Sequence, residues 1–451
     1  MRLTKTIIAI ILIWSSSLVG LNMERFASHA PEFFVHSLDV ELHDDLALVT
    51  GNGGFMIYDI SDGIRYINRY IPEGGRTAAI YNCCAGEGVA FAAARGAGMY
   101  IIDISNPQSP ALLTRWQVQN QSLEDAALYN DLVVVSAHQD GLYILNVSDP
   151  AHPEVTGTFE EMENCWELAF DEEGRLFVAD GVGGLVILSI DDEPDILSRM
   201  ETSGNAIDIK VSGDLCAIAV GADGVDIFDV SDPADPIFLL NFNTPTYAGH
   251  IGFDGDLVAV ADWDAVLVYD ISDRENPELT GYYPTGYRAM GVDMRGENVY
   301  LADWSKFIGF AYGPIDGADI AFSTRRIIPV GEGVMDTSLY VFNHGQQELE
   351  VERISCNAQE FNVDPGNFNL DSGDSLELSI TYLPPDSRST SLRFQSNDTD
   401  DPTSTITLEP SGGLGVGDRA PDFSSRILGG GNYRLSDMQD RVQLIIFWAS
   451  W

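Results

Sequence analysis

Short apolar runs rich in Val, Ile and Leu alternate with turns rich in Gly, Asp, Asn and Pro along residues 31–317. In one stretch, apolar runs at Ala248–Phe253 and Leu257–Ala261 flank the polar turn Asp254-Gly255-Asp256, and a third run follows at Ala265–Ile271. Runs of this length, enriched in β-branched residues and bounded by turn residues, predict strands. The span has no helical period, so consecutive β-strands joined by tight turns are expected.

The pattern repeats seven times. A string such as Ile57-Tyr58-Asp59-Ile60-Ser61 closes the third predicted strand of each unit, and its central residue recurs every 40 to 44 residues. A period of this length suits a four-stranded blade, so residues 31–317 predict a seven-bladed β-propeller. The central residues are Asp59, Asp103, Asn146, Ser189, Asp229, Asp270 and Ala311.

The strings Gly141–Pro150 and Gly224–Pro233 share the form Gly-Leu/Val-x-Ile-x-Asp/Asn-Val-Ser-Asp-Pro. They resemble the LVIVD-repeat family of extracellular β-propellers. A WD-repeat assignment is weaker because no unit ends its third strand with Trp-Asp.

The seventh unit has no outer strand of its own, because Gly313-Pro314 leads directly into different sequence. The segment Pro31–Val35 looks like the outer strands that begin at Pro153 and Pro277. We therefore expect Pro31–Val35 to complete the last blade and to cover an edge that otherwise invites aggregation.

Residues 318–412 predict a separate β-sandwich. Strands are expected at Leu339–Asn343, Leu349–Ile354, Phe361–Val363, Leu376–Tyr382 and Leu392–Gln395. The motifs Val341–Gly345 and Ser396–Pro402 resemble those of Ig-like domains of the abnormal-spindle/Hydin type, which implies a spacing or binding role. Calcium binding by Asp398, Asp400 and Asp401 is an alternative to a solvated turn.

The last segment, residues 413–451, contains Val416–Phe423, Tyr433–Asp437 and Leu444–Trp451. These three motifs resemble the opening of a thioredoxin-like redoxin domain of the alkyl hydroperoxide reductase/thiol-specific antioxidant superfamily. The resemblance implies thiol–disulfide exchange by a Cys-x-x-Cys motif directly after Trp451, where the chain stops. The expected fold class is all-β, a propeller plus an Ig-like sandwich, with a truncated thioredoxin-like α/β fragment.

Residues 1–30 predict a secretory signal peptide. Arg2 and Lys5 precede an apolar stretch from Ile7 to Leu21, and small residues follow, ending in Ser28-His29-Ala30. An uncleaved membrane anchor is the alternative, although the stretch is short for a span. Either outcome places the body outside the cytoplasm of a bacterium, in the periplasm, at the cell surface or in the medium. The five cysteines fit no zinc site or cystine scaffold.

The formal net charge of −45 excludes nucleic acid as a partner, because phosphate contacts need clustered Lys and Arg. A well-solvated surface is the simplest explanation, with calcium or a cationic ligand as the alternative. No EF-hand spacing, His-x-His or His-Glu-x-x-His motif occurs. We therefore expect no resident metal and no cofactor.

Loops at one face of the predicted ring are the candidate ligand site, because loops on a rigid scaffold vary freely. Asp-Trp pairs follow two neighbouring second strands and suggest an aromatic and acidic patch for a sugar or a cation. Packing of the Trp side chains over the channel is the alternative. The recurrent aspartates, such as Asp59, favour a turn role over catalysis. The candidates are His138, Asp262, Trp263, Asp303, Trp304, Tyr287 and Arg288, with Arg95, Tyr247 and His250 nearby in the pattern.

Three functions fit these observations. The first is an exported multidomain redox protein in which the propeller and sandwich bind or space an extracellular ligand or protein. The second is a non-catalytic surface interaction or adhesion protein, and the third is a propeller enzyme that acts on an extracellular polymer. The membrane is a partner only if the N-terminal segment stays uncleaved.

Overall fold

The computed structural model is built from strands and turns, and the part of the chain that it describes contains no helix. The described residues are 22–30, 36–73, 79–190, 194–322, 326–327, 334–356, 359–383, 390–399, 402–408, 424–426 and 432–434. They divide into two compact units. The first holds residues up to Ile320 with the short segments 342–349 and 370–374, and the second holds the remainder.

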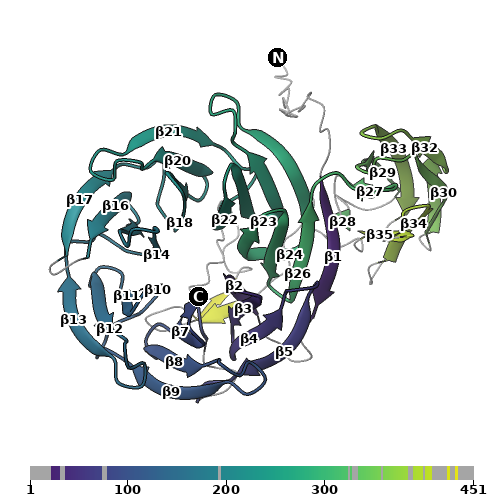
Figure 1. The fold of residues 1–451 in the computed structure, drawn as a ribbon. Coiled ribbons are helices and arrows are strands. Elements are labelled where there is room, and N and C mark those ends of the chain that lie inside the picture. Colours follow the sequence, from purple (N-terminus) through teal and green to yellow (C-terminus); the bar gives the residue numbers. More distant parts are fainter. Residues whose placement is uncertain are drawn as a thin grey trace. The chain divides into compact units, whose positions relative to one another are not determined.

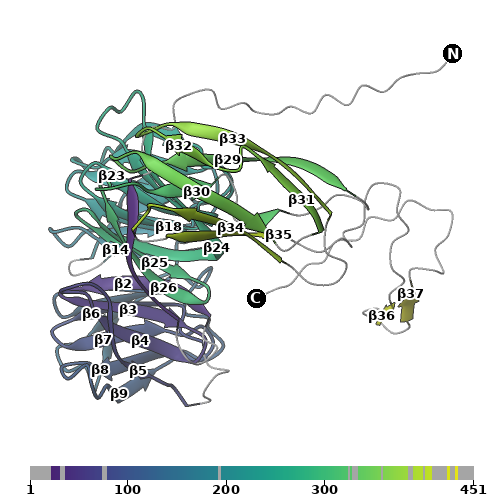
Figure 2. The same cartoon turned by 90° about the vertical axis from the view of Figure 1, so that its right-hand side faces the viewer.

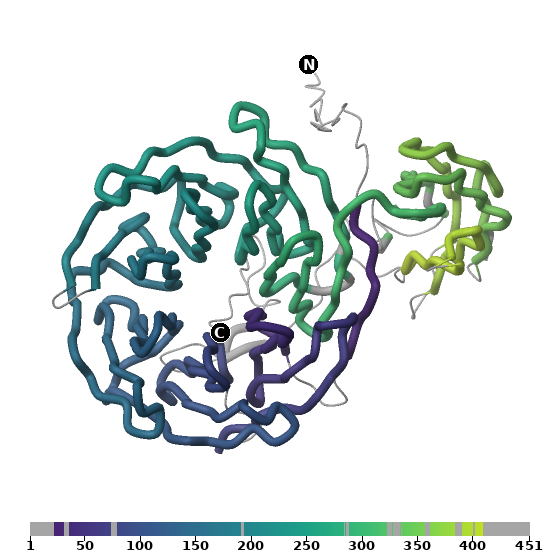
Figure 3. The backbone as a smooth tube through the Cα atoms, viewed as in Figure 1, coloured from purple at the N-terminus to yellow at the C-terminus, as the bar shows by residue number. Residues whose placement is uncertain are grey.

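The first unit is a ring of four-stranded antiparallel sheets, the arrangement of a β-propeller (Figure 1). In the five four-stranded sheets of the ring, the strands follow chain order from the centre of the ring to its rim (Figure 3). Five of the sheets are β2 (Ser37–His43), β3 (Leu46–Gly51), β4 (Gly54–Asp59) and β5 (Arg65–Tyr70); β6 (Asn82–Gly86), β7 (Val89–Ala93), β8 (Met99–Asp103) and β9 (Ala111–Trp116); β10 (Ala126–Tyr129), β11 (Leu132–Ser136), β12 (Leu142–Asn146) and β13 (Glu154–Phe159); β14 (Glu167–Phe170), β15 (Leu176–Ala179), β16 (Leu185–Ser189) and β17 (Asp195–Met200); and β18 (Asp208–Ser212), β19 (Leu215–Ala219), β20 (Val225–Asp229) and β21 (Ile237–Phe242).

A six-stranded sheet completes the ring and contains two blades. They are joined because two strands continue through a bend, where Trp263 pairs with Ala289. Counted in this way, the described residues form seven four-stranded units. The sixth unit is β22 (His250–Asp254), β23 (Leu257–Asp270) and the first part of β24 (Glu278–Arg295), and the seventh is the rest of β24, β25 (Asn298–Asp303), β26 (Lys306–Tyr312) and β1 (Met23–His29).

The strand that closes the seventh blade is β1, not Pro31–Val35 as the sequence pattern suggested. β1 runs antiparallel to β26, from Met23 opposite Tyr312 to His29 opposite Phe307. Pro31–Val35 itself lies outside the described residues. The prediction was wrong because the open edge of β26 recruits a partner by backbone hydrogen bonding, which needs no strongly apolar sequence. β1 also lies within the segment assigned above to the leader.

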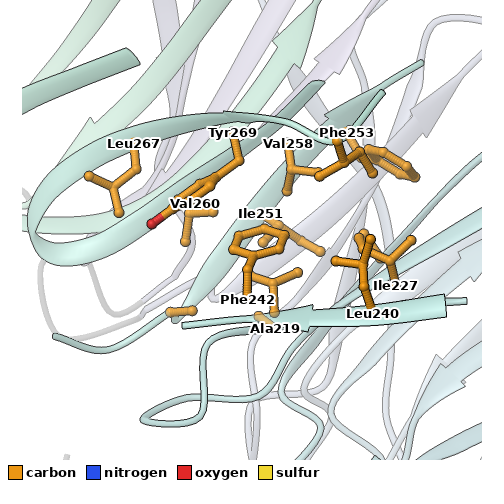
Figure 4. Close-up of a cluster of buried hydrophobic side chains, with 14 of the residues drawn as sticks. Ala219, Ile227, Leu240, Phe242, Ile251, Phe253, Val258, Val260, Leu267 and Tyr269 are labelled. Atoms are coloured by element: carbon orange, nitrogen blue, oxygen red, sulfur yellow. The ribbon is translucent and has the colours of Figure 1, made fainter. Parts of the chain in front are cut away.

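Apolar side chains pack between neighbouring blades. Ile227 and Phe242 of the fifth blade meet Ile251, Val260 and Tyr269 of the sixth (Figure 4). Each large side chain that is buried in this way stabilises the ring by about 1.5–3 kcal/mol. The apolar side chains of these strands thus hold neighbouring blades together. Their packing keeps the inner strands at fixed positions around the channel.

The recurrent aspartates close turns, as expected. The Asp59 carboxylate accepts the backbone N–H of Ser61 at 2.9 Å and its hydroxyl at 2.6 Å. Asp103 and Asp229 make the same pair of contacts to Ser105 and Ser231. These hydrogen bonds to Ser61, with the nearby Arg65, lower the pKa of Asp59 to about 2. The repeated Asp-x-Ser is therefore a turn motif at the end of the third strand.

The second unit contains two sheets whose long strands run alongside one another (Figure 2). Phe322 from one sheet meets Phe394 from the other, with ring centroids 4.6 Å apart. The five strands expected in this region are all present. One sheet has β27 (Ile320–Phe322), β29 (Met335–Asn343), β33 (Ser375–Leu383) and β31 (Gln359–Asp364), and the other has β28 (Arg326–Ile327), β35 (Thr403–Leu408), β34 (Thr390–Ser396), β30 (Leu349–Cys356) and β32 (Phe368–Leu370).

Of residues 413–451, the structure describes only the hairpin of β36 (Ser424–Arg426) and β37 (Asn432–Arg434). The three redoxin-like motifs lie outside the described residues except for Tyr433-Arg434. The apolar stretch Ile7–Leu21 also lies outside them. Among the residues that are described, no helix is long and apolar enough to cross a membrane.

Candidate functional site

One end of the ring carries a set of equivalent hairpin turns that follow the second strand of the blades. The first turn residue has a positive φ in six of these described turns. Glycine, which tolerates this conformation, occupies two of the positions, whereas a larger residue in the left-handed region costs roughly 1–2 kcal/mol. The residues are Arg95 (φ 48°), His138 (52°), Gly181 (57°), Gly221 (68°), Trp263 (55°) and Trp304 (25°).

Trp263 and Trp304, on neighbouring blades, share one cation. The guanidinium carbon of Arg288 lies 4.6 Å from the ring centroid of Trp263 and 5.3 Å from that of Trp304. His36 packs against Trp304 with ring centroids 4.0 Å apart. Trp263 remains 39% exposed, so this aromatic and cationic patch faces solvent. Cation–π contact of this kind fixes the guanidinium while leaving indole surface open.

The two aspartates next to these Trp residues are buried under the turns. The Asp262 carboxylate accepts the backbone N–H of Tyr247 at 2.6 Å and the hydroxyl of Thr244 at 2.7 Å. Burial raises its pKa, although these hydrogen bonds oppose the rise. Burial likewise raises the pKa of Asp303 to about 6. The structure therefore does not assemble the acidic part of the expected patch, and the side chain of Tyr287 lies outside the described residues.

His138 belongs to a different cluster, on the third blade. Its Nε2 lies 2.6 Å from Glu124 Oε1, and Arg95 Nε donates to Glu124 Oε2 at 2.9 Å. The Arg95 guanidinium also stacks 3.7 Å from the centroid of the Tyr81 ring. Burial favours protonation of Glu124, but the His138 hydrogen bond and the Arg95 charge outweigh it and lower the pKa of this carboxyl. The cluster connects neighbouring blades, and its charged side chains are paired with one another. This arrangement favours a structural role in holding the blades together.

The inner strands line a channel with a row of residues of which the sequence analysis named only His250. The row is one residue per blade at matching repeat positions, and its members are mostly acidic. A second row lies two residues further along each strand and therefore faces the same side. The first row is Asp39, Asn82, Asp125, Glu167, Asp208, His250 and Gly291, and the second is Glu41, Cys84, Ala127, Ala169, Lys210, Gly252 and Asp293.

Members of both rows surround a cavity of about 240 Å³. Two glycines let the inner strands approach where the ring closes. A Cβ on Gly252 would meet the backbone of Asp293 and Met294, and one on Gly291 would lie 2.4 Å from the Cα of Asp39. Aligning the inner strands of the seven repeats reveals the acidic row in the sequence, but only after the strand register is known.

Several channel carboxylates bridge adjacent blades. Asp125 Oδ2 accepts the backbone N–H of Leu168 at 2.9 Å, and Asp208 Oδ2 accepts that of Ile251 at 2.7 Å. These N–H groups belong to inner strands, whose channel-side edge has no strand partner in its own sheet. The acidic residues thus satisfy edge donors that a purely apolar channel would leave unpaired.

The channel holds more acidic than basic side chains. Desolvation by burial raises the pKa of Asp39 to about 6, of Asp125 to about 7 and of Glu41 to about 8. Lys210 Nζ lies 3.9 Å from Glu41 Oε2. Burial disfavours charge on Lys210, but the surrounding carboxylates outweigh this and raise its pKa well above the ordinary value.

Comparison with known proteins identifies the repeat and supports the fold of the ring. Residues 85–118, 124–161, 203–244 and 246–285 each match the LVIVD repeat. The chain carries four LVIVD repeats. No curated protein matches it. Among solved structures, U3-55K aligns with a TM-score of 0.53 at 11% identity, over 64% of this chain and 99% of that one, which shows a common fold alone. The computationally designed Ika8 protein aligns with a TM-score of 0.48 at 11% identity, over 66% of this chain and 99% of that one.

The matched LVIVD repeats contain some of the candidate residues. Glu124 and His138 lie in the second matched repeat, and Trp263 lies in the fourth. Asp208 and His250 of the channel also lie in matched repeats, whereas Glu167 lies between two of them. These five candidate residues therefore lie within matched repeats, whereas Arg288 and Trp304 lie outside them.

Proposed function

We propose that the LVIVD ring is a carbohydrate-binding module of an exported bacterial protein, with Trp263, Trp304 and Arg288 as its contact surface. The observation that carries the proposal is the backbone conformation of the two Trp residues. Both occupy left-handed positions, where the fifth blade has Gly221 instead. Strained backbone conformations cluster at active sites and ligand-binding sites.

The chemistry of the patch narrows the ligand class. Exposed indole faces stack on the apolar faces of sugar rings, and the Arg288 guanidinium supplies hydrogen-bond donors in a planar fork. A cationic ligand is disfavoured, because Arg288 already lies over both indoles and the neighbouring Asp262 and Asp303 carboxylates are buried. A sugar that bears hydroxyl or carboxylate groups fits this set best.

The surroundings of the ring support the rest of the proposal. The motifs quoted above favour an Ig-like sandwich for residues 318–412 and the start of a redoxin domain for residues 413–451. Under this proposal the ring and sandwich bind and space, and thiol–disulfide exchange belongs to a Cys-x-x-Cys that follows Trp451 in a longer gene product. Under the same proposal, the charged start and the apolar stretch Ile7–Leu21 direct export, so the modules act outside the cytoplasm.

A glycan array probed with the full chain tests the binding role. We expect binding to one family of glycans, with affinity reduced at least tenfold in Trp263→Ala and in Arg288→Ala. Ile237→Ala is the matched control, because Ile237 is 58% exposed on the outer strand β21. Absence of glycan binding, or equal affinity in Trp263→Ala and Ile237→Ala, would refute the proposal.

A non-catalytic adhesion protein is the alternative that the same ring supports. The two differ in the continuation of the chain. Insulin reduction by the longer gene product supports the redox role, and its absence from a product that folds and binds glycan supports adhesion.

A further inference from the structure

We propose that the channel binds a divalent transition-metal ion between the side chains of Glu167, Asp208 and His250, with Asp39 beside them. This site is separate from the Trp263 patch and does not depend on the carbohydrate proposal. The three residues come from the inner strands of consecutive blades, the fourth, fifth and sixth.

The spacing of the ligand atoms fits a shared cation. One oxygen or nitrogen from each of the three side chains lies within 4.8 Å of the others. His250 Nδ1 is 3.7 Å from Asp208 Oδ2 and 3.6 Å from Asp39 Oδ1. Both distances are too long for hydrogen bonds. They are close to the separation of about 3.3–3.6 Å that two ligands have on a four-coordinate ion with bonds of about 2.0–2.2 Å.

Hydrogen bonds behind the cluster hold two of the carboxylates in place. Asn82 Nδ2, from the second blade, donates to Glu167 Oε2 at 2.7 Å. The backbone N–H of Ile251 donates to Asp208 Oδ2 at 2.7 Å. Outer contacts of this type orient metal ligands before the ion arrives, so little ordering remains to be done on binding.

The charge of the channel favours a cation at this place. Six carboxylates belong to the two rows, from Asp39, Glu41, Asp125, Glu167, Asp208 and Asp293, against one ammonium from Lys210. Lys210 is engaged with Glu41. Buried carboxyl groups are paired, protonated or bound to metal, and one ammonium cannot pair with six of them. A bound dication lowers the proton affinity of its ligands and removes part of this imbalance.

The donor set indicates the class of ion. An imidazole nitrogen with carboxylates suits Zn²⁺ or Mn²⁺, whereas Ca²⁺ and Mg²⁺ prefer shells made only of oxygen. For a site with nitrogen and oxygen donors, Zn²⁺ binds more tightly than Mn²⁺. We therefore expect the order Zn²⁺, Mn²⁺, Ca²⁺ in affinity.

Isothermal titration of the full chain, without an affinity tag and after treatment with EDTA, tests the site. The expected result is one equivalent of Zn²⁺ per chain, with at least tenfold weaker binding in His250→Ala and in Asp208→Asn. His152→Ala is the control, because His152 lies on the surface next to Asp149 with its side chain 81% exposed, and its affinity should equal that of the wild type. Asp208→Asn keeps an oxygen that can accept the Ile251 N–H.

Substitution with Co²⁺ gives a readout on the unmodified chain. We expect d–d absorption bands without thiolate charge transfer, because the donors are nitrogen and oxygen. Strong thiolate bands would move the ion to Cys83 or Cys84 and overturn the assignment. The assignment is also overturned if the wild type fails to bind Zn²⁺. It is overturned as well if His250→Ala, shown to be folded by circular dichroism, binds Zn²⁺ as tightly as the wild type does.

Discussion

Met23→Ala tests whether the ring is closed by β1. The Met23 side chain is 4% exposed and packs with Val268 and Phe310 in the core shared by the last two blades. Replacement of a buried Met by Ala costs about 2–5 kcal/mol, from lost burial and the cavity left behind. Because β1 lies at the rim, where relaxation is easier, we expect about 2–3 kcal/mol. For a unit of this size that corresponds to a decrease in Tm of about 3–5 °C.

Thermal unfolding followed by circular dichroism measures this change. Arg25→Ala is the control on the same strand, because Arg25 is exposed and, among the described residues, its guanidinium donates one long hydrogen bond, of 3.3 Å, to Tyr283. Surface substitutions of this kind change stability by about 0.5 kcal/mol or less. Equal melting temperatures for Met23→Ala and Arg25→Ala would show that β1 is not part of the core.

Shortened chains extend the same reasoning to export. A chain that begins at Asn22 retains β1 and should melt with the full chain. A chain that begins at Pro31 leaves β26 as an open edge and should melt at a lower temperature and aggregate. We therefore expect mass spectrometry of the exported protein to place any leader cleavage before Asn22. A stable exported product beginning at Pro31 would contradict both the pairing and this expectation.

Three further predictions concern thiols, pH and ring closure. In the native protein, Ellman's reagent should react first with Cys356, which is partly exposed. The other four thiols are buried, and burial raises their pKa. Rapid reaction of more than one thiol before unfolding would contradict this prediction. Burial raises the pKa of Asp125 to about 7, so the folded state retains a proton that the unfolded state loses near pH 4. Tm should therefore fall as the pH rises from about 4 to 7. Asp125→Asn should make this fall shallower, and an unchanged slope would show that Asp125 titrates normally. Gly291→Ala should lower Tm strongly, because its Cβ would lie 2.4 Å from the Cα of Asp39. Gly249→Ala should leave Tm nearly unchanged, because the nearest atom to its Cβ would lie 3.8 Å away. Similar melting of the two variants would show that blades seven and one do not approach as described.

Local patterns were sufficient for the strands and for their turns. Strands such as β30 and β33 appear where alternation and turn residues predict them, and Asp59 closes the turn that its Asp-x-Ser string implies. These features depend on neighbours in the sequence, and local hydrogen bonds decide them. The four matches to the LVIVD repeat agree with the repeat period for the same reason.

The identity of the closing strand could not be obtained in this way. Both Met23–His29 and Pro31–Val35 are short segments with some strand character. The choice between them depends on which one reaches the edge of β26, a strand almost 300 residues away in the chain. Register is a long-range property, and composition alone does not determine it.

The sequence by itself determined the repeat, the strand order within a blade and the surplus of negative charge. Only the tertiary structure decided where that charge lies. Closing the ring brings one ligand atom from each of Glu167, Asp208 and His250, which lie on three different blades, within 4.8 Å of the others. It also buries Asp262 and Asp303, while Arg288 lies over Trp263 and Trp304. The repeat period determines which residues of different blades are equivalent. The distances between those residues across the channel are determined only when all the blades pack into a ring.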